Sequence, residues 1–490
     1  MRLTDTGAPF KRLNRKSLPL LFTGLAIIFS LPVAWAQTGG VRGTIKADDN
    51  SALSFATIFV KQLGTGTTAN EDGFYELQLK PGRYDLTFQH LGRKTEVRVI
   101  EVTNDFVELN IRLEEQNIVL ETITINANDE DPAYTIMRKA IAKANYHRNI
   151  LDSYSARVYI KGAGKLKDYP WLAKKQLEKE GIEKGRVYIS ESVSDIKFTR
   201  PNKFEEKVIS IRSDGKDNNT SPNPYIFGSF YEPEVAETVS PLSPKAFSYY
   251  RFEYLGTFKD RDYDVSRIKV IPRSKGDNVV DGTIYIVEDS WSIHSMDIHT
   301  TKLGIDVFMQ MMCAPIEDKA WLPVSHKFKI DGKVFGFEFE YNYLASVSNY
   351  QITVNPALYV ENMDVIDEKK EKELAKEIEK KQQEVRKKKQ DTETSRLKER
   401  LAAGEEITRK ELKTIVRDYE KEERKLAKQP EVISENIFKV DSGAYKKDSA
   451  YWASIRPIPL TREEVKGYEK ADSLAERERA EEAGDTVRQS

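Results

Sequence analysis

The chain has almost no cysteine. Its 490 residues include a single one, Cys313, so no disulfide can form within the chain. The residues around Cys313, VFMQMMCAP, are mostly apolar. This environment indicates a buried, unreactive thiol rather than a nucleophile. We therefore expect a fold held together by packing and hydrogen bonds.

The chain also lacks an excess of either charge. Lys and Arg number 77 and Asp and Glu number 78, which gives a formal net charge of −1. A protein that binds nucleic acid would carry a basic surplus or a basic stripe. We expect no nucleic-acid partner.

Sequence signatures of catalysis are missing. No histidine of the chain begins an H-E-x-x-H motif, and there is no G-x-S-x-G elbow, no phosphate-binding G-x-x-x-x-G-K-[ST] loop and no G-x-G-x-x-G. Acidic pairs such as Asp48-Asp49 are too short for a calcium loop. We predict a protein that is not an enzyme and has no cofactor, metal site or catalytic residue. A hydrolase that assembles its site from scattered carboxylates stays open as a distant alternative.

One long apolar run is present, near the N-terminus. Basic residues precede the stretch from Leu18 to Val33, and Ala34-Trp35-Ala36 follows it. This order predicts a signal peptide at residues 1–36, because the run is short against the roughly 20 residues of a spanning helix. We expect export to the periplasm or association with the outer membrane, with an uncleaved anchor as the alternative.

Residues 37–115 show the period-two alternation of short strands. Tyr75, Leu77 and Leu79 share one strand face, and the turn signals NEDG and KPGR separate the apolar runs. About seven strands in some seventy residues predict a small antiparallel β-sandwich.

This stretch resembles the carboxypeptidase regulatory-like module. The resemblance runs from GTIKADDNSALSF to LTFQHLG and rests on the following residues: Gly43, Ala56, Thr68, Asp72, Gly73, Phe74, Gly82, Tyr84 and Gly92. It implies a prealbumin-like sandwich, which is often found at the N-terminus of exported outer-membrane proteins and has no catalytic residues of its own.

A connector at 116–150 leads into a second region of strands at 151–356. The connector ends in a predicted helix, with Asp131 as its cap and Pro132 in its first turn. Beyond it we predict a large, curved antiparallel sheet of eight to eleven strands. The long break from Ser213 to Pro244 predicts a lid or a disordered insert, and its aromatic residues favour partial burial.

The clearest strand of this region is FGFEFEYNY, whose aromatic residues alternate with small or polar ones. We predict that its aromatic side faces inward, as packed core or as the lining of an apolar ligand site. The candidate residues are Phe335, Phe337, Phe339, Tyr341 and Tyr343.

The middle region resembles a domain family of unknown function that follows the regulatory-like module in Gram-negative outer-membrane proteins. Matching stretches are DPAYTIMRKAI, YSARVYIKG, SPLSPKAFSYYRFEYLG and GTIYIVEDSWSI. More weakly, its strand pattern is similar to that of the periplasmic lipoprotein carriers, whose curved sheet holds acyl chains.

The C-terminal part changes composition twice. In residues 366–430, 38 of 65 side chains are charged, which predicts solvated helices across 357–430. Residues 431–490 then hold DSAYWASIRPIPLT, followed by a predicted capping box of Thr461 and Glu464. We predict that this segment docks on the large sheet in an extended form set by its prolines. The candidate docking residues are Tyr451, Trp452, Ile455 and Leu460.

Two functions of different class remain. In the family that the middle region resembles, a segment like DSAYWASIRPIPLT precedes an outer-membrane barrel, and the alternating segments of a barrel do not follow here. The first hypothesis is a non-catalytic structural or binding module of the cell envelope, with an outer-membrane or periplasmic protein as partner. The second is a soluble periplasmic carrier that binds an acyl chain or other apolar ligand in the curved sheet, with lipid as a partner. A carrier needs a lined cavity, whereas a docking module needs a filled core and an exposed apolar patch.

Overall fold

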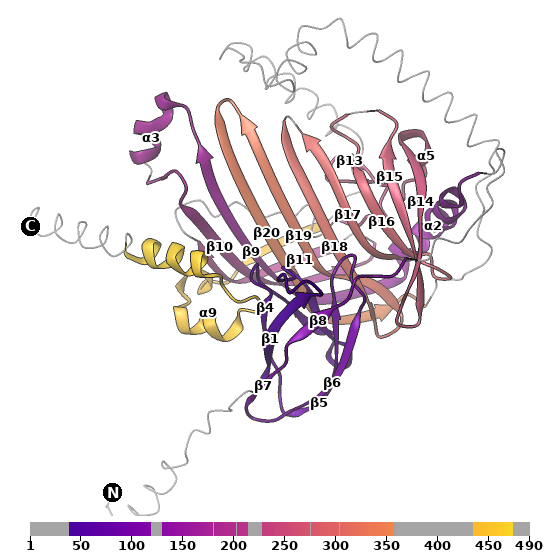
Figure 1. Cartoon of the computed structure of the whole chain (residues 1–490), viewed down its shortest axis with the longest axis horizontal. Coiled ribbons are helices and arrows are strands. Elements are labelled where there is room, and N and C mark those ends of the chain that lie inside the picture. The colour runs from indigo at the N-terminus through magenta and orange to yellow at the C-terminus, as the bar shows by residue number, and fades with distance from the viewer. Residues whose placement is uncertain are drawn as a thin grey trace, which may run out of the picture.

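The protein is mainly β, as the alternation predicts. The computed structural model describes residues 39–118, 130–358 and 435–473, apart from 214–227 and the single positions 180, 202, 275, 303 and 357. A small sandwich stands against a much larger curved sheet (Figure 1). The predicted signal peptide and nearly all of the charged tract lie outside the described residues. Among the described residues, no helix is long and apolar enough to span a membrane.

Two four-stranded sheets form the sandwich. One has the order β4-β1-β7 with β8 also on β1, and the other has the order β3-β2-β5-β6. The strands are β1 Gly40–Ala47, β2 Thr57–Val60, β3 Thr65–Thr68, β4 Phe74–Gln78, β5 Gly82–Gln89, β6 Glu96–Val102, β7 Phe106–Glu108 and β8 Ile111–Leu113, with a 3₁₀ turn, η1, at Lys61–Leu63. The two short strands β7 and β8 pair with β1 in parallel, so β1 departs from the antiparallel pattern.

The predicted turn NEDG begins the hairpin strand β4. The side-chain oxygen of Asn70 accepts hydrogen bonds from the backbone N–H groups of Asp72 and Phe74, both at 3.0 Å. Gly73 has a φ of +74°, and a Cβ at this position would lie 2.6 Å from the carbonyl oxygen of Ile45. The turn therefore needs glycine for both its backbone angle and its close approach to β1.

The large sheet has eleven strands in the order β14-β15-β16-β17-β18-β19-β20-β9-β10-β11-β21. Its neighbours pair antiparallel except β21, which runs parallel to β11. The strands are β9 Leu151–Asp168, β10 Val187–Thr199, β11 Lys203–Ser213, β14 Tyr250–Asp260, β15 Tyr263–Pro272, β16 Asp281–Val287, β17 Ile293–Lys302, β18 Ile305–Ile316, β19 Ala320–Val334, β20 Phe337–Val354 and β21 Glu435–Val440.

The chain enters this sheet in its middle. After β9, β10 and β11 it crosses to the opposite edge through the short strands β12 Glu234–Val235 and β13 Thr238–Val239 and the helix α5 Ala246–Tyr249. Six hairpins then bring it back until β20 pairs with β9. In the crossing segment, Phe230 is 4% exposed and packs in the core, and Tyr231 packs against it, so the described part of the predicted break is partly buried.

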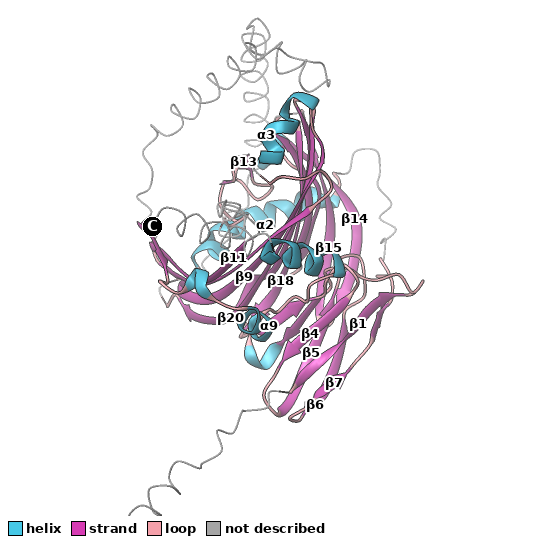
Figure 2. Cartoon of the chain, turned by 90° about the vertical axis from the view of Figure 1, so that its left-hand side faces the viewer, coloured by secondary structure: helices cyan, strands magenta, loops and turns pink. Residues whose placement is uncertain are grey.

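Different parts of the chain cover the two faces of the large sheet. Helix α2, Pro132–Asn149, lies on the inner, concave face, and its Met137 and Ala140 pack in one core with Val158 of β9. The side chain of Asp131 caps this helix by accepting a hydrogen bond from the N–H of Ala133. On the outer face lies the sandwich (Figure 2).

The sandwich contacts the outer face through both apolar and polar groups. Phe59 packs against Ala314 and Ile316 of β18 and Val324 of β19. The hydroxyls of Thr57 and Ser325 lie 2.9 Å apart. The two parts therefore share a packed, hydrogen-bonded boundary rather than a linker alone.

The segment around Trp452 fills the corner between the sandwich and the outer face. Trp452 is fully buried and packs with Tyr159, Val193 and Leu344. The extended form predicted for this segment is wrong, because residues Ser449–Ile455 form the helix α9, in which Asp448 accepts a hydrogen bond from the N–H of Tyr451 at 2.8 Å.

The other docking residues follow from this helix. Tyr451 and Ile455, one turn apart, are partly buried against the same cluster. Leu460, placed in the docking set by its sequence position, is only half-buried and lies outside that cluster, where Ile458 is buried instead. The hydroxyl of Thr67 on the sandwich donates to the carbonyl of Pro457, so the segment contacts both parts.

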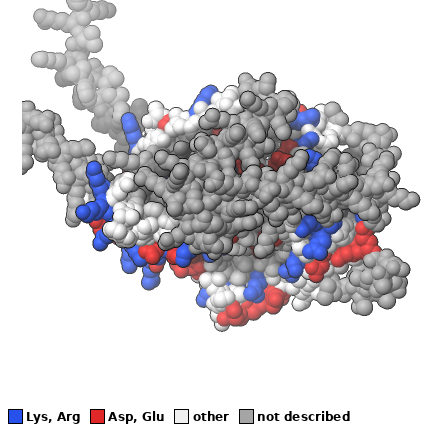
Figure 3. All heavy atoms as spheres, turned by 90° about the horizontal axis from the view of Figure 1, so that it is seen from above, with Lys and Arg blue, Asp and Glu red and all other residues white. Residues whose placement is uncertain are grey.

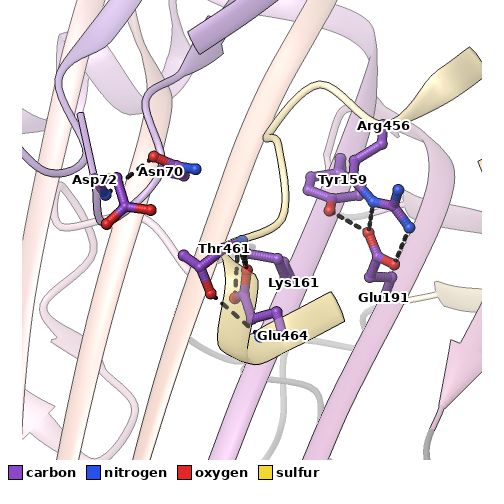
Figure 4. Close-up of polar contacts among 8 residues, drawn as sticks. All are labelled: Asn70, Asp72, Tyr159, Lys161, Glu191, Arg456, Thr461 and Glu464. Atoms are coloured by element: carbon purple, nitrogen blue, oxygen red, sulfur yellow. Dashed lines mark hydrogen bonds and ion pairs between the residues drawn. The ribbon is translucent and has the colours of Figure 1, made fainter. Parts of the chain in front are cut away.

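Two buried ion pairs hold the segment in place (Figure 4). The guanidinium of Arg456 donates two hydrogen bonds, at 2.6 and 2.7 Å, to Glu191 of β10, and Tyr159 donates a third at 2.5 Å. Burial opposes ionisation of Glu191, but these donors outweigh it and lower the pKa of that carboxyl.

The second pair involves the predicted capping box, which is confirmed. Glu464 accepts from the N–H of Thr461 at 2.7 Å, and Thr461 accepts from the N–H of Glu464 at 3.3 Å. The ammonium of Lys161 on β9 lies 2.8 Å from the same carboxylate, with both side chains at least nine-tenths buried. The capping box thus begins the helix at 462–473 and anchors it to the sheet.

We predict that Arg456→Ala lowers the free energy of unfolding by about 3–5 kcal/mol, because Glu191 would stay buried without its partner. Urea unfolding followed by circular dichroism measures this loss. The matched control is Arg157→Ala, which breaks the half-exposed ion pair between Arg157 of β9 and Asp195 of β10. This change should lower the free energy of unfolding by under about 1 kcal/mol. Equal losses in the two variants would show that the buried pair has no special role.

Candidate functional site

The aromatic residues of β20 form a strip on the inner face. Tyr343 is buried in the core cluster of the inner face and Tyr341 packs against that cluster. The rings of Phe339, Tyr341 and Tyr343 follow one another at centroid distances of 5.9 and 6.1 Å. Phe337, at the start of the strand, is half-buried.

Phe335 does not belong to this strip. It lies in the turn between β19 and β20 with a φ of +55°, beside Gly336 at +79°, and is 40% exposed. The alternation of aromatic residues continues through the turn in the sequence, which is why the prediction included it.

Glycines on the neighbouring strands give the strip its shape. A Cβ on Gly162, Gly164 or Gly332 would lie 2.6, 2.3 or 2.2 Å from the ring of its cross-strand partner. Those partners are Tyr343, Tyr341 and Phe339 respectively. The rings therefore lie flat across the adjacent strands, where any other residue would push them away.

A cavity of about 730 Å³ occupies the part of the inner face beside α2. Strands β9 and β20 and their neighbours on both sides form its floor. Residues 228–232, the end of α2 and β21 form its walls. The apolar lining includes Tyr154, Val158, Ile196, Phe198, Met311 and Val347. Cys313 also lines this space, and burial raises the pKa of its thiol, in keeping with the unreactive cysteine expected from the sequence.

A few polar side chains interrupt the apolar lining. Glu206 is 8% exposed, accepts a hydrogen bond from Ser194 at 2.8 Å, and has its pKa raised by burial. At the cavity wall, Arg148 pairs with Glu232 at 2.9 Å. His147 shares a 2.8 Å hydrogen bond with the carbonyl of Ser290, which requires its Nε2 to carry the proton.

His326 is the most unusual polar group of the cavity. It is 2% exposed, its ring is parallel to that of Phe328, and neither ring nitrogen has a hydrogen-bond partner among the described residues. Burial lowers its pKa to about 4, so the imidazole is neutral at pH 7 and offers one donor and one acceptor. The sequence pattern around His326 matches no catalytic or metal-binding motif, so its place in the cavity was not predicted.

A second group of polar residues lies under the sandwich. Asp260 and His294 are 3.0 Å apart, and His294 in turn is 3.0 Å from the hydroxyl of Ser295. Although these are the residue types of a hydrolase triad, Ser295 is 1% exposed and the adjoining space measures about 30 Å³. That volume holds a water molecule and no substrate.

Metal-binding chemistry has no obvious place in the described ranges. There, no cluster of three or more His, Cys, Asp or Glu residues has the geometry to hold an ion. The 730 Å³ cavity is lined mainly by apolar side chains, with a few groups that can form hydrogen bonds.

We predict that His326 makes the protein less stable in mild acid. A histidine whose pKa falls from 6.5 to about 4 on folding takes up its proton more readily when unfolded, so stability falls as the pH drops from 6.5 toward 4. Between pH 7.5 and pH 5 the loss should be about 2 kcal/mol.

Replacement by an apolar ring tests this assignment. His326→Phe should remove that part of the acid sensitivity and leave stability at pH 7.5 equal or higher, since no hydrogen bond within the described residues is lost. Urea unfolding at both pH values measures the difference. The same acid loss in wild type and variant would show that His326 is solvated or partnered in solution.

Solved structures with a related arrangement are distant. They include a DUF1329 family protein from Desulfovibrio piger, with 9% identity and a TM-score of 0.21, covering 47% of this chain and 96% of that chain. A LolA superfamily protein from Nitrosomonas europaea has 11% identity and a TM-score of 0.18, with coverages of 46% and 94%. The MucA/MucB complex of Pseudomonas aeruginosa has 7% identity and a TM-score of 0.14, and the match covers 45% of this chain and 98% of that chain. Values this low carry no argument about function.

Family models match the chain more directly. No curated protein matches it significantly, whereas the CarboxypepD_reg-like domain matches residues 41–125 and the family of unknown function DUF5686 matches residues 136–350. The two matches follow one another in the order that the sequence resemblance predicts. The chain thus joins a CarboxypepD_reg-like domain to a DUF5686 domain.

Proposed function

We propose that the large sheet binds an apolar chain, such as an acyl chain, in the cavity on its inner face, and that the protein is a non-catalytic, ligand-binding module of the cell envelope. The observation that carries this proposal is the cavity of about 730 Å³ with its largely aromatic and aliphatic lining. Ligand pockets of proteins typically measure about 300–1,000 Å³ and are lined in this way.

The outer face of the sheet is covered by other parts of the chain, whereas the inner face is covered only in part. This difference supports a carrier over a docking module. The outer face is already occupied by the sandwich and by the segment around Trp452. On the inner face, α2 packs over the half near β14 to β17, and the cavity lies over the other half. A module built only to dock would have filled this space with side chains.

The polar groups support a ligand that is mainly hydrocarbon with a small polar part. Arg148 is paired with Glu232, burial raises the pKa of Glu206, and His326 is neutral at pH 7. A fully charged headgroup would find little compensation inside such a lining. The export expected from the N-terminal segment would place this binding site in the periplasm or at the outer membrane.

We predict that the purified protein binds a fluorescent long-chain fatty acid, and that Val158→Trp weakens this binding at least tenfold by filling the cavity. Val158 is 1% exposed and lines the cavity, whereas the matched control, Lys197→Trp, adds the same ring at an exposed position on β10. Fluorescence titration gives both dissociation constants, and urea unfolding checks that each variant is folded.

Native mass spectrometry of protein purified from an envelope fraction would show a natural ligand as added mass. Equal probe binding in wild type and Val158→Trp would refute the proposal.

A further inference from the structure

The end of the β9–β10 hairpin carries large apolar side chains into solvent. The short turns η2, Trp171–Ala173, and α3, Lys174–Lys179, connect these two strands. Trp171 is 81% exposed and Leu172 is 73% exposed. An exposed leucine alone is ordinary, but a tryptophan and a leucine side by side at a projecting end are not.

A third apolar side chain comes from the neighbouring hairpin. The turn between β19 and β20 lies against the same end, because a Cβ on Gly336 would be 3.0 Å from the ring of Pro170. The residue before it, Phe335, is 40% exposed. Figure 1 shows α3 and this turn at the same end of the sheet, away from the sandwich. We call Trp171, Leu172 and Phe335, with the lysines of α3, the apolar tip.

Basic side chains stand beside these apolar ones. Lys174, Lys175 and Lys179 are all exposed, and Lys174 has a loose pair with Glu178 at 3.8 Å. Within the described residues, no acidic partner lies within 4.0 Å of Lys175 or Lys179. Seen from above, Lys and Arg side chains lie at the left side of the described surface, with uncharged and some acidic surface beside them (Figure 3).

We propose that the apolar tip docks the protein on the surface of a lipid bilayer that contains anionic lipids. Tryptophan concentrates at the boundary between headgroups and acyl chains, where its ring is buried and its N–H stays solvated. Leu172 and Phe335 would enter the same layer. Lys175 and Lys179 would lie near the phosphates, where an anionic surface attracts basic residues.

A bilayer fits this surface better than a protein partner does. A stable protein interface buries about 800 Å² on each side and involves about 20–30 residues. The apolar tip offers three large apolar side chains on two projecting turns, which is much less. A bilayer requires no matching shape, and side chains on a convex turn can enter it one by one.

The test uses the full chain with vesicles of two compositions, phosphatidylcholine alone and phosphatidylcholine with about one quarter phosphatidylglycerol. We expect co-sedimentation with the anionic vesicles that weakens as salt is raised. The double variant Trp171→Ser, Leu172→Ser should reduce the partition coefficient at least tenfold. The double variant Lys175→Glu, Lys179→Glu should reduce binding to the anionic vesicles far more than to the neutral ones.

The matched control is Leu63→Ser, which removes a side chain that is 46% exposed in η1 of the sandwich and should leave binding unchanged. Tryptophan emission should shift to shorter wavelength on anionic vesicles in the wild type and not in Trp171→Phe, which locates the inserted ring. Binding that is equal in the wild type and the Trp171→Ser, Leu172→Ser variant, or no binding to either vesicle, would overturn the proposal. Fatty-acid binding by the same variants is measured separately, so failure here leaves the cavity proposal standing.

Discussion

The eleven-stranded sheet has apolar side chains on both faces, and other parts of the chain must cover them to exclude water. This requirement determines where the other elements pack. A single helix is much narrower than such a sheet, so α2 covers only part of the inner face. The outer face is covered by an entire domain together with the segment around Trp452, which follows the end of β20 only after about ninety-five residues. The cavity exists because the cover of the inner face is incomplete.

The outer face is also where the chain buries charge. Lys161 of β9 and Glu191 of β10 are buried opposite each other on adjacent strands, and each meets a partner from the C-terminal segment. Buried pairs of this kind often add little net stability, because desolvation offsets the attraction. Their consequence here is geometric: Arg456 and Glu464 each fit one counterpart, so the segment can dock in one register. The apolar side chains of Trp452 and Ile458 supply the burial, and the charges fix where it occurs.

Sequence periodicity was enough to predict the mainly β fold, the large antiparallel sheet and the helix capped by Asp131, because each depends on local pattern. The docking helix was missed although Asp448 is a good cap, since two prolines directed the prediction to an extended form. Phe335 was misplaced because alternation cannot show where a turn begins. The cavity depends on which residues from eight or more separate elements meet on one face, and no local pattern contains that information; His326 gave no signal beyond its residue type.

The aromatic strip connects the two proposed sites physically. β20 begins next to the turn of Phe335 in the apolar tip, continues through Phe339, Tyr341 and Tyr343, and reaches Val347 in the cavity lining. Gly162 and Gly164 let the rings of Tyr343 and Tyr341 lie flat across the adjacent strands, and half-buried aromatic surface at Phe339 and Tyr341 lies between the tip and the cavity. If the tip rests on a bilayer, a hydrocarbon chain that leaves the membrane meets aromatic surface along this strand before it reaches the cavity. Such a surface lowers the cost of exposing the chain to water during transfer, because apolar area stays covered at each step.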